Sequence, residues 1–228
     1  MWTFLVENQV IPTFGIRIKE SLEELNFDPD IIAKFEFPEN PPWTYPTAMV
    51  NLTLSYAKKD QTDPSQYISL HNEVKDVFRD YDFIYTDGSV ADDKAAAAAV
   101  IDNYSSIERL PDKSSIFSAE LHALYLALDR VETADDDERN FIIFSDSKSA
   151  LQAISGQDWT HPLVLYILER LNWLVQYQEK RILFYWIPSH VGIRGNEKAD
   201  TAAKAGLSKR VTNVPIPYGD FKNTSMSF

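Results

Sequence analysis

Four acidic side chains stand where separate secondary-structure elements are expected to meet, and they are Asp87, Glu120, Asp146 and Asp200. The first and third of these each follow a short apolar run, whereas the other two lie near the starts of amphipathic segments. Hard divalent cations such as Mg²⁺ prefer oxygen ligands and often bind through a few carboxylates, with phosphate and water completing the shell. Two such ions about 4 Å apart can activate a water molecule and stabilise the leaving oxygen of a phosphodiester. The four carboxylates are therefore candidate ligands for metal-dependent phosphodiester chemistry.

Each of these carboxylates also has an ordinary structural interpretation, because the chain carries 34 Asp and Glu residues. Asp87 precedes a glycine and could form a turn, and Asp146 could cap the helix that follows it. Glu120 could supply negative charge at a helix start, and Asp200 could lie on a solvated helix face. Taken singly, the residue types leave both interpretations open.

The candidate residues depend on a framework of strands and helices that begins at Tyr81. Five apolar runs have the length and composition of strands, at residues 83–85, 95–101, 107–110, 141–144 and 182–187. Four segments have the periodicity of helices, at residues 118–131, 147–154, 162–175 and 196–205, with Gly206 as the cap of the last one. The order βββαβααβα predicts an α/β fold with a mixed five-stranded sheet flanked by helices.

The two ends of the chain differ from this framework. The first part is rich in proline, and we predict a connector over residues 1–79. Within it we expect a short helix at 21–25, extended chain at 41–43, and a packed helix that begins at Pro64. Residues 209–228 have no evident periodicity and are interpreted as a tail.

The overall charge limits the kinds of partner that the chain can hold. The formal net charge is −12, and residues 81–210 carry fourteen Lys and Arg against twenty Asp and Glu. Proteins that hold nucleic acid by general attraction gather basic residues, so we expect weak intrinsic affinity that needs low salt or a tethered partner. No apolar stretch is long enough to span a membrane, so no membrane partner is expected. The absence of cysteine excludes thiolate metal sites and is compatible with an intracellular location, in the cytoplasm or nucleus.

The sequence around each carboxylate is more specific than the carboxylate itself. The four motifs are Ile84-Tyr85-Thr86-Asp87-Gly88-Ser89, Ser118-Ala119-Glu120-Leu121-His122-Ala123, Phe144-Ser145-Asp146-Ser147, and the long run from Trp186 to Asp200. In this order they resemble the type 1 ribonuclease H domain of non-LTR (LINE-type) retrotransposon polyproteins, over residues 80–208. Residues 1–79 resemble, more loosely, the connector that follows the reverse transcriptase in those polyproteins.

The resemblance implies a ribonuclease H-like fold and hydrolysis of the RNA strand of RNA–DNA hybrids, leaving 5′-phosphate and 3′-hydroxyl ends. It implies that two Mg²⁺ ions, for which Mn²⁺ may substitute, are bound by Asp87, Glu120, Asp146 and Asp200. It also implies that His190 lies on a mobile loop beside the scissile phosphate, where it assists proton transfer or product release. A reverse transcriptase domain in the parent polyprotein is a candidate partner.

Substrate contacts are expected near the first and third motifs. Family members read the minor groove of the hybrid, where 2′-hydroxyls distinguish RNA from DNA, which makes Gly88, Ser89 and Ser147 candidate substrate-binding residues. Asn196 is interpreted as the N-cap of the last helix rather than as a ligand. His122 is expected to pack or to face solvent.

Two stretches depart from the pattern of the relatives. Residues 92–94 and the alanine run stand where relatives are glycine-rich. Alanine favours helices, but the run lies between strand-like segments and ends in Val100-Ile101, which favours a strand. In addition, no basic protrusion is found between Asp146 and His190, so we expect hybrid affinity below that of dedicated cellular enzymes.

Two other functions remain as alternatives. The chain could be a catalytically inactive ribonuclease H-like module for nucleic-acid binding or assembly, in which case it would bind a hybrid without cutting it. It could also be an integrase or exonuclease that shares the fold, which cleavage of DNA rather than RNA would indicate. The presence of all four carboxylates and of His190 favours the nuclease.

Overall fold

The computed structural model describes most of the chain from residue 41 to residue 220. The described residues are 16, 19–20, 41, 44–57, 61–135, 139–158, 161–214, 217 and 219–220. The helix expected at 21–25 lies outside them, as does most of the extended segment expected at 41–43.

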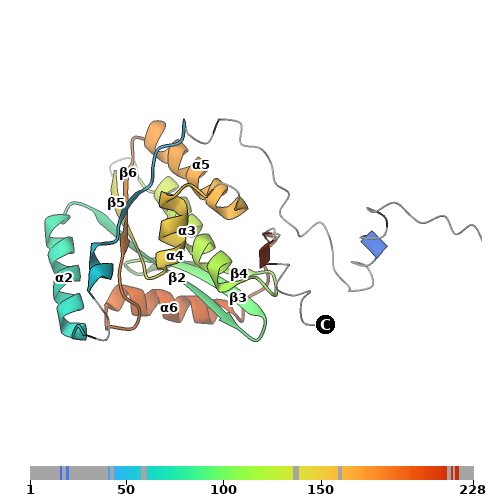
Figure 1. Cartoon of the computed structure of the whole chain (residues 1–228), viewed down its shortest axis with the longest axis horizontal. Helices are drawn as coiled ribbons and strands as arrows, with labels where there is room; N and C mark the ends of the chain where they lie inside the picture. Colours follow the sequence, from blue (N-terminus) through green and yellow to red (C-terminus); the bar gives the residue numbers. More distant parts are fainter. Residues whose placement is uncertain are drawn as a thin grey trace, which may run out of the picture.

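The structure is an α/β fold built on a mixed six-stranded sheet (Figure 1). The strands are β1 (Met49–Asn51), β2 (Asp82–Ala91), β3 (Lys94–Ile101), β4 (Tyr104–Leu110), β5 (Asn140–Ser145) and β6 (Arg181–Trp186), in the spatial order β1-β6-β5-β2-β3-β4. The strands β2, β3 and β4 pair antiparallel, whereas β2, β5, β6 and β1 pair parallel. The carboxyl end of β5 therefore lies beside the middle of β2, at the centre of the sheet, and ligands of open α/β sheets bind at the carboxyl ends of strands.

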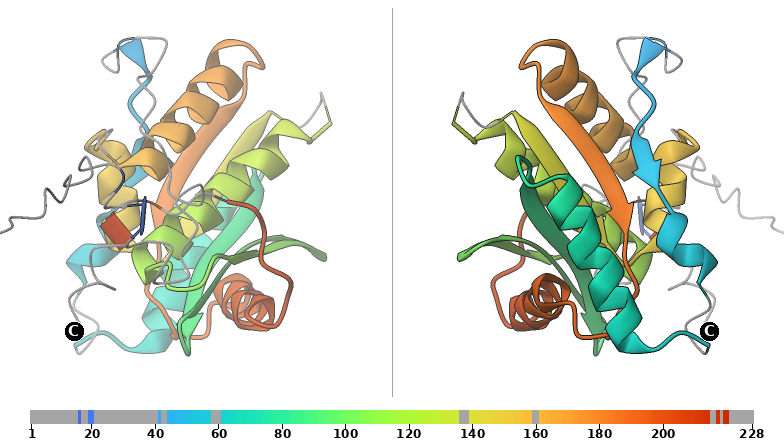
Figure 2. Two further views of the ribbon diagram at one scale, coloured as in Figure 1. Left: turned by 90° about the vertical axis from the view of Figure 1, so that its right-hand side faces the viewer. Right: turned by 90° about the vertical axis from the view of Figure 1, so that its left-hand side faces the viewer.

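Helices cover both faces of the sheet (Figure 2). They are α2 (Pro64–Val77), α3 (Ile116–Glu132), α4 (Lys148–Ser155), α5 (Pro162–Gln176) and α6 (Arg194–Gly206), with a short 3₁₀ helix, η3 (Thr53–Tyr56). Alternate residues of a strand face opposite sides, so Ile143 packs in the core beneath α3 and α5, whereas Phe144 packs in the core with residues of α2 and α6. Each layer thus has its own apolar core.

The predicted order of strands and helices is confirmed from β2 to α6, but the predicted number of strands is wrong. The sixth strand is β1, which adds to the edge of β6 with Met49 opposite Leu183 and Asn51 opposite Tyr185. It has only three residues, and its pairing comes from backbone hydrogen bonds to β6 rather than from an apolar pattern of its own. Sequence periodicity has no signal for such a strand.

The alanine run forms β3, as predicted. The side chains of residues 95–99 are almost completely buried, because α3 and α6 both contact this strand. A Cβ on Gly206 would lie 2.8 Å from the Cβ of Ala96, which shows how closely α6 approaches. Asp92 and Asp93 have positive φ values of 48° and 61° and form the turn between β2 and β3. Small residues on β3 therefore allow helices to pack on both faces.

The ends of the described chain pack against the sheet. Helix α2 begins at Pro64, as predicted, and Asp63 caps it by accepting a hydrogen bond from the Ser65 N–H at 2.8 Å. Near the C-terminus, Thr212 donates its N–H to the carbonyl of Arg109 at 2.8 Å. The division into a connector (residues 1–79), a domain (80–208) and a tail (209–228) stays a prediction. Within the described part of the chain, no helix has both the length and the apolar character needed to cross a membrane.

Candidate active site

Three of the four candidate carboxylates converge at the centre of the sheet. Asp87 lies on β2, Glu120 on α3 and Asp146 directly after β5, and each offers an oxygen within 4.8 Å of the others. Asp87 is 6% exposed and Glu120 is 8% exposed. Residues more than twenty positions apart in the chain thus form one cluster of oxygen donors, in which Asp87 and Glu120 are buried and Asp146 is half-buried.

Gly88 allows Glu120 to reach this cluster. A Cβ at position 88 would lie 2.8 Å from the backbone nitrogen of Glu120 and 2.9 Å from the carbonyl carbon of Ala119. Only a glycine lets α3 lie this close to β2. Atom Oε2 of Glu120 is buried and has no hydrogen-bond partner among the described residues. A buried carboxylate oxygen without a donor is costly, and it fits a site that takes a cation.

Asp146 is held in place by two donors from other elements. The indole N–H of Trp186 donates to its backbone carbonyl at 3.0 Å, and the amide Nδ2 of Asn196 donates to its Oδ2 at 3.1 Å. The predicted role of Asn196 as an N-cap is wrong, because α6 begins at Arg194 and Ile193 is its N-cap residue. Asn196 is 1% exposed and lies in the first turn, so its side chain points into the protein toward Asp146. Gly206 is likewise the last residue of α6 rather than a cap beyond it.

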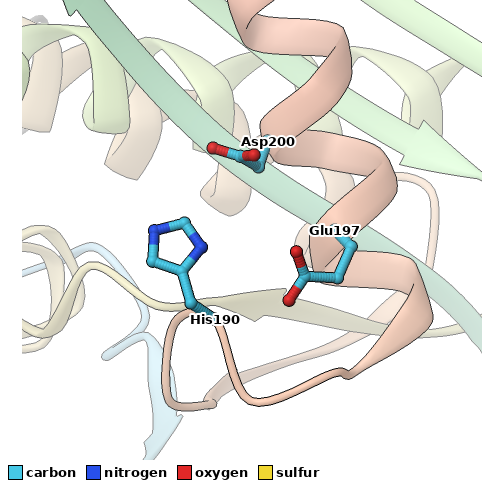
Figure 3. A group of neighbouring side chains, drawn as sticks. All are labelled: His190, Glu197 and Asp200. Atoms are coloured by element: carbon cyan, nitrogen blue, oxygen red, sulfur yellow. The ribbon is translucent and has the colours of Figure 1, made fainter.

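Asp200 belongs to a second group, which adjoins the first. His190, Glu197 and Asp200 each offer a ligand atom within 4.8 Å of the other two, and Figure 3 shows the imidazole facing both carboxylates of α6. Lys204, one turn along α6, donates to Oδ2 of Asp200 at 2.7 Å. The charge of Asp200 raises the pKa values of Asp87 and Asp146, so the two groups interact electrostatically.

Burial and mutual repulsion raise the pKa values of the carboxylates in this cluster. Burial, with the charges of Asp146 and Asp200, raises the pKa of Asp87 to about 8. Burial and the neighbouring carboxylates also raise the pKa of Glu120 well above its usual value. For Asp146 burial raises the pKa, while the Asn196 hydrogen bond and the charge of His190 oppose the shift. Crowded carboxylates of this kind fit divalent cations, whose charge would offset the repulsion.

The three predicted substrate-binding residues lie around this cluster. Gly88 and Ser89 are on β2, directly after Asp87, and Ser147 follows Asp146. Ser147 caps α4, and its hydroxyl accepts the N–H of Ala150 at 3.4 Å. Gly88 also has the packing role against α3 described above, and substrate binding by these three residues stays a prediction.

The other histidines have structural surroundings. His71 is buried on α2 and its Nε2 lies 2.9 Å from the hydroxyl of Tyr85. His122 is buried and pairs with the Glu108 carboxylate at 2.8 Å, which agrees with the expected packing role. His161 precedes α5 and stacks edge-on against Phe117. Among the described histidines, only His190 belongs to a group of three possible metal ligands, with Glu197 and Asp200.

Asn196 and Glu197 are site residues that the sequence motifs did not indicate. Both lie in the first turn of α6, four and three positions before Asp200. Residues at these spacings lie on one side of a helix. This spacing is the signal that could have identified them.

A mixed sheet of this strand order, with carboxylates gathered where β5 ends beside the middle of β2, defines a ribonuclease H-like α/β fold. A family model for RNase H matches residues 80–208, which is more than half of the chain. The chain therefore belongs to the RNase H family, a family of nucleases.

Proposed function

We propose that this protein is a type 1 ribonuclease H, which hydrolyses the RNA strand of RNA–DNA hybrids to give 5′-phosphate and 3′-hydroxyl ends. The observation that carries the proposal is the buried cluster of Asp87, Glu120 and Asp146 within a domain of the RNase H family. Hydrolysis of a phosphodiester needs negative charge to be neutralised at the reacting phosphate, and this cluster is suited to hold the cations that do so.

We propose that Asp87, Glu120, Asp146 and Asp200 hold two Mg²⁺ ions, or Mn²⁺ in their place. Such ions, when bound, lower the pKa of a water molecule and stabilise the charge that develops on the phosphate. Support comes from the hard oxygen donors, from the buried Oε2 of Glu120, which no described residue hydrogen-bonds, and from the raised carboxylate pKa values. Asp200 lies close enough to raise the pKa values of Asp87 and Asp146, which supports its role as the ligand that completes the set.

We propose that His190 assists proton transfer or product release when the phosphodiester bond is hydrolysed. Its imidazole is exposed and faces Asp200, so it can reach both solvent and a phosphate bound at the carboxylates. Gly88, Ser89 and Ser147 lie next to two of the carboxylates, and we propose that they contact the hybrid where its 2′-hydroxyls are exposed.

Cleavage of a hybrid with a labelled RNA strand tests the activity. We expect cleavage with Mg²⁺ and none with EDTA, and we expect Asp146→Asn to lower the rate by about 10³-fold or more because it weakens a metal ligand. Asp129→Asn is the matched control, because Asp129 pairs with Arg170 on the surface of α3. Full Mg²⁺-dependent activity in Asp146→Asn would contradict its role.

The same assay separates the alternatives. A gel shift of the hybrid without cleavage would indicate the inactive binding module, which the acidic net charge and the long N-terminal part favour. Cleavage of a labelled DNA strand would instead indicate an integrase or exonuclease.

The biological context is also a proposal. The motif from Trp186 to Asp200 supports an origin in a LINE-type retrotransposon polyprotein, in which a reverse transcriptase domain would supply the hybrid. Within that context residues 1–79 would be the connector, residues 80–208 the nuclease domain and residues 209–228 a tail. We place the activity inside the cell, in the cytoplasm or nucleus.

A further inference from the structure

The loop that carries His190 joins β6 to α6 and is fixed at both ends by buried apolar side chains. Ile187, Val191 and Ile193 are each at most 5% exposed. Between them the backbone adopts left-handed conformations, with φ of 53° at His190 and 86° at Gly192. A non-glycine residue in this region costs about 1 kcal/mol or more, so the surrounding contacts must hold the loop in this shape.

One polar contact ties the middle of this loop to α6. The N–H of Gly192 donates to Oε1 of Glu197 at 3.3 Å, and the N–H of Glu197 donates to the carbonyl of Ile193 at 3.0 Å. Glu197 therefore holds the loop through its side chain and through its backbone. Ile193, the N-cap residue, has no polar side chain with which to do so.

The Glu197 carboxylate also lies close to His190, the residue of the loop that we propose to act in cleavage. A ligand atom of Glu197 lies within 4.8 Å of one on His190 and of one on Asp200 (Figure 3). His190 is exposed, and its ring makes no hydrogen bond to another described residue. The position of His190 thus depends on the backbone of the loop. The Glu197 side chain contributes to the conformation of that backbone through its hydrogen bond from Gly192.

We propose that Glu197 is a positioning residue that holds the loop through the Gly192 N–H and so keeps His190 beside Asp200. The consequence for cleavage rests on the proposed function, because it requires His190 to act on the reacting phosphate. The hold on the loop does not depend on that function and can be measured without substrate.

Amide hydrogen exchange at Gly192 measures the hold directly. In Glu197→Ala the Gly192 amide loses its acceptor, so we expect its exchange to become about tenfold faster, which corresponds to the net value of one hydrogen bond. Glu197→Gln keeps an oxygen acceptor and should remain near the wild-type rate. Glu73→Ala removes an exposed carboxylate from α2 and is the matched control. Amides in the middle of α6 report whether the helix itself has changed.

Cleavage kinetics then test the consequence. We expect Glu197→Ala to lower kcat by about threefold to tenfold with little change in KM, because the lost hydrogen bond orders the loop rather than binds the hybrid. Glu197→Gln should recover most of the loss. A Gln variant as slow as the Ala variant would overturn the proposal, because the charge rather than the hydrogen bond would then matter.

The two measurements separate the two proposals. Unchanged Gly192 exchange in Glu197→Ala would overturn the positioning role, whether or not the protein cuts hybrids. Faster exchange in a protein that cleaves no hybrid would confirm the hold on the loop and refute the proposed nuclease function.

Discussion

At the scale of single residues, the buried carboxylates destabilise the metal-free protein at neutral pH. The pKa of Asp87 is about 8 in the fold against 3.8 for a free side chain. The folded state therefore binds this proton more tightly than the unfolded state, and stability falls as pH rises from about 4 through 8. A cation bound to the cluster would remove this cost by favouring the ionised forms.

Asp87→Asn is therefore expected to stabilise the metal-free protein while abolishing cleavage. The amide cannot ionise, so at pH 7.5 in EDTA we expect the midpoint of thermal unfolding to rise by roughly 2–4 °C, equivalent to about 1 kcal/mol. At pH 5, which is closer to the pKa of 3.8 in the unfolded chain, less of this penalty applies and the difference should be smaller. A lower midpoint for the variant at both pH values would refute the electrostatic explanation.

Asn196 affects the same site through Asp146. Its amide donates to the carboxylate oxygen, which fixes the orientation of that candidate ligand. We predict that Asn196→Ala weakens Mn²⁺ binding by about tenfold, as loss of a supporting hydrogen bond does at other metal sites. Isothermal titration calorimetry with Mn²⁺ measures this without substrate, and Thr201→Ala, on the exposed side of α6, is the control. Equal affinities in both variants would exclude the role.

The sequence predicts the roles of some of these site residues better than those of others. Asp87 or Asp146 alone is no more than an acidic residue near a turn, and only the motifs around them predict a shared pocket. Glu197 lies inside the longest motif, yet its role depends on the path of the loop at Gly192, which no local pattern specifies. Asn196 is of a residue type that often caps helices. However, α6 begins earlier, after the buried Ile193, so the side-chain amide of Asn196 lies inside the protein.

At the scale of elements, α2 is held on the sheet by buried polar and aromatic contacts. Its His71 hydrogen-bonds Tyr85 on β2 and packs against Phe144 on β5 at a ring-centroid distance of 4.9 Å. Burial and the charge of Lys75 lower the pKa of His71 to about 4. The helix therefore depends on a neutral histidine.

Acidification should weaken the docking of α2. Because the folded pKa of His71 is about 4 and the unfolded value is 6.5, the unfolded state takes up the proton first, and stability is lost as pH falls from 6.5 to 4. We expect this group to contribute about 2 kcal/mol to the loss. His71→Gln cannot titrate but can still bond Tyr85, so urea unfolding at pH 7 and pH 4.5 should show a smaller decrease for the variant. Equal decreases would show that other groups cause the acid sensitivity.

Elements with a strong pattern of their own are the ones the sequence predicts well. The strand β5 is a continuous apolar run and α5 has a clear apolar face, and both appear within one or two residues of their predicted bounds. The strand β1 was missed because three residues carry no periodicity and its partner β6 supplies the pairing. The start of α6 was displaced by two residues because buried contacts of the loop, rather than a polar cap, determine it.

At the scale of the whole molecule, the negative charge opposes the approach of a nucleic acid. The net charge is −12, and the part of the chain from 81 to 210 is itself acidic. Two bound divalent cations would offset only part of this charge. The hybrid must therefore be held mainly by contacts at the site rather than by a general attraction to the surface.

This balance predicts a shallow dependence of hybrid affinity on salt. Each phosphate neutralised by Lys or Arg contributes about 0.9 to the slope of log affinity against log salt, and ordinary DNA binders make roughly 6–10 such contacts. We expect a slope of at most about 3 in magnitude, together with weak affinity at every salt concentration. Fluorescence anisotropy of a labelled hybrid, titrated with the Asp87→Asn variant between 25 and 150 mM KCl, gives this slope without cleavage, and a DNA duplex serves as the comparison. A slope near 6 would mean that a basic surface on this acidic protein holds the substrate, and the tethered partner that we propose would then be unnecessary.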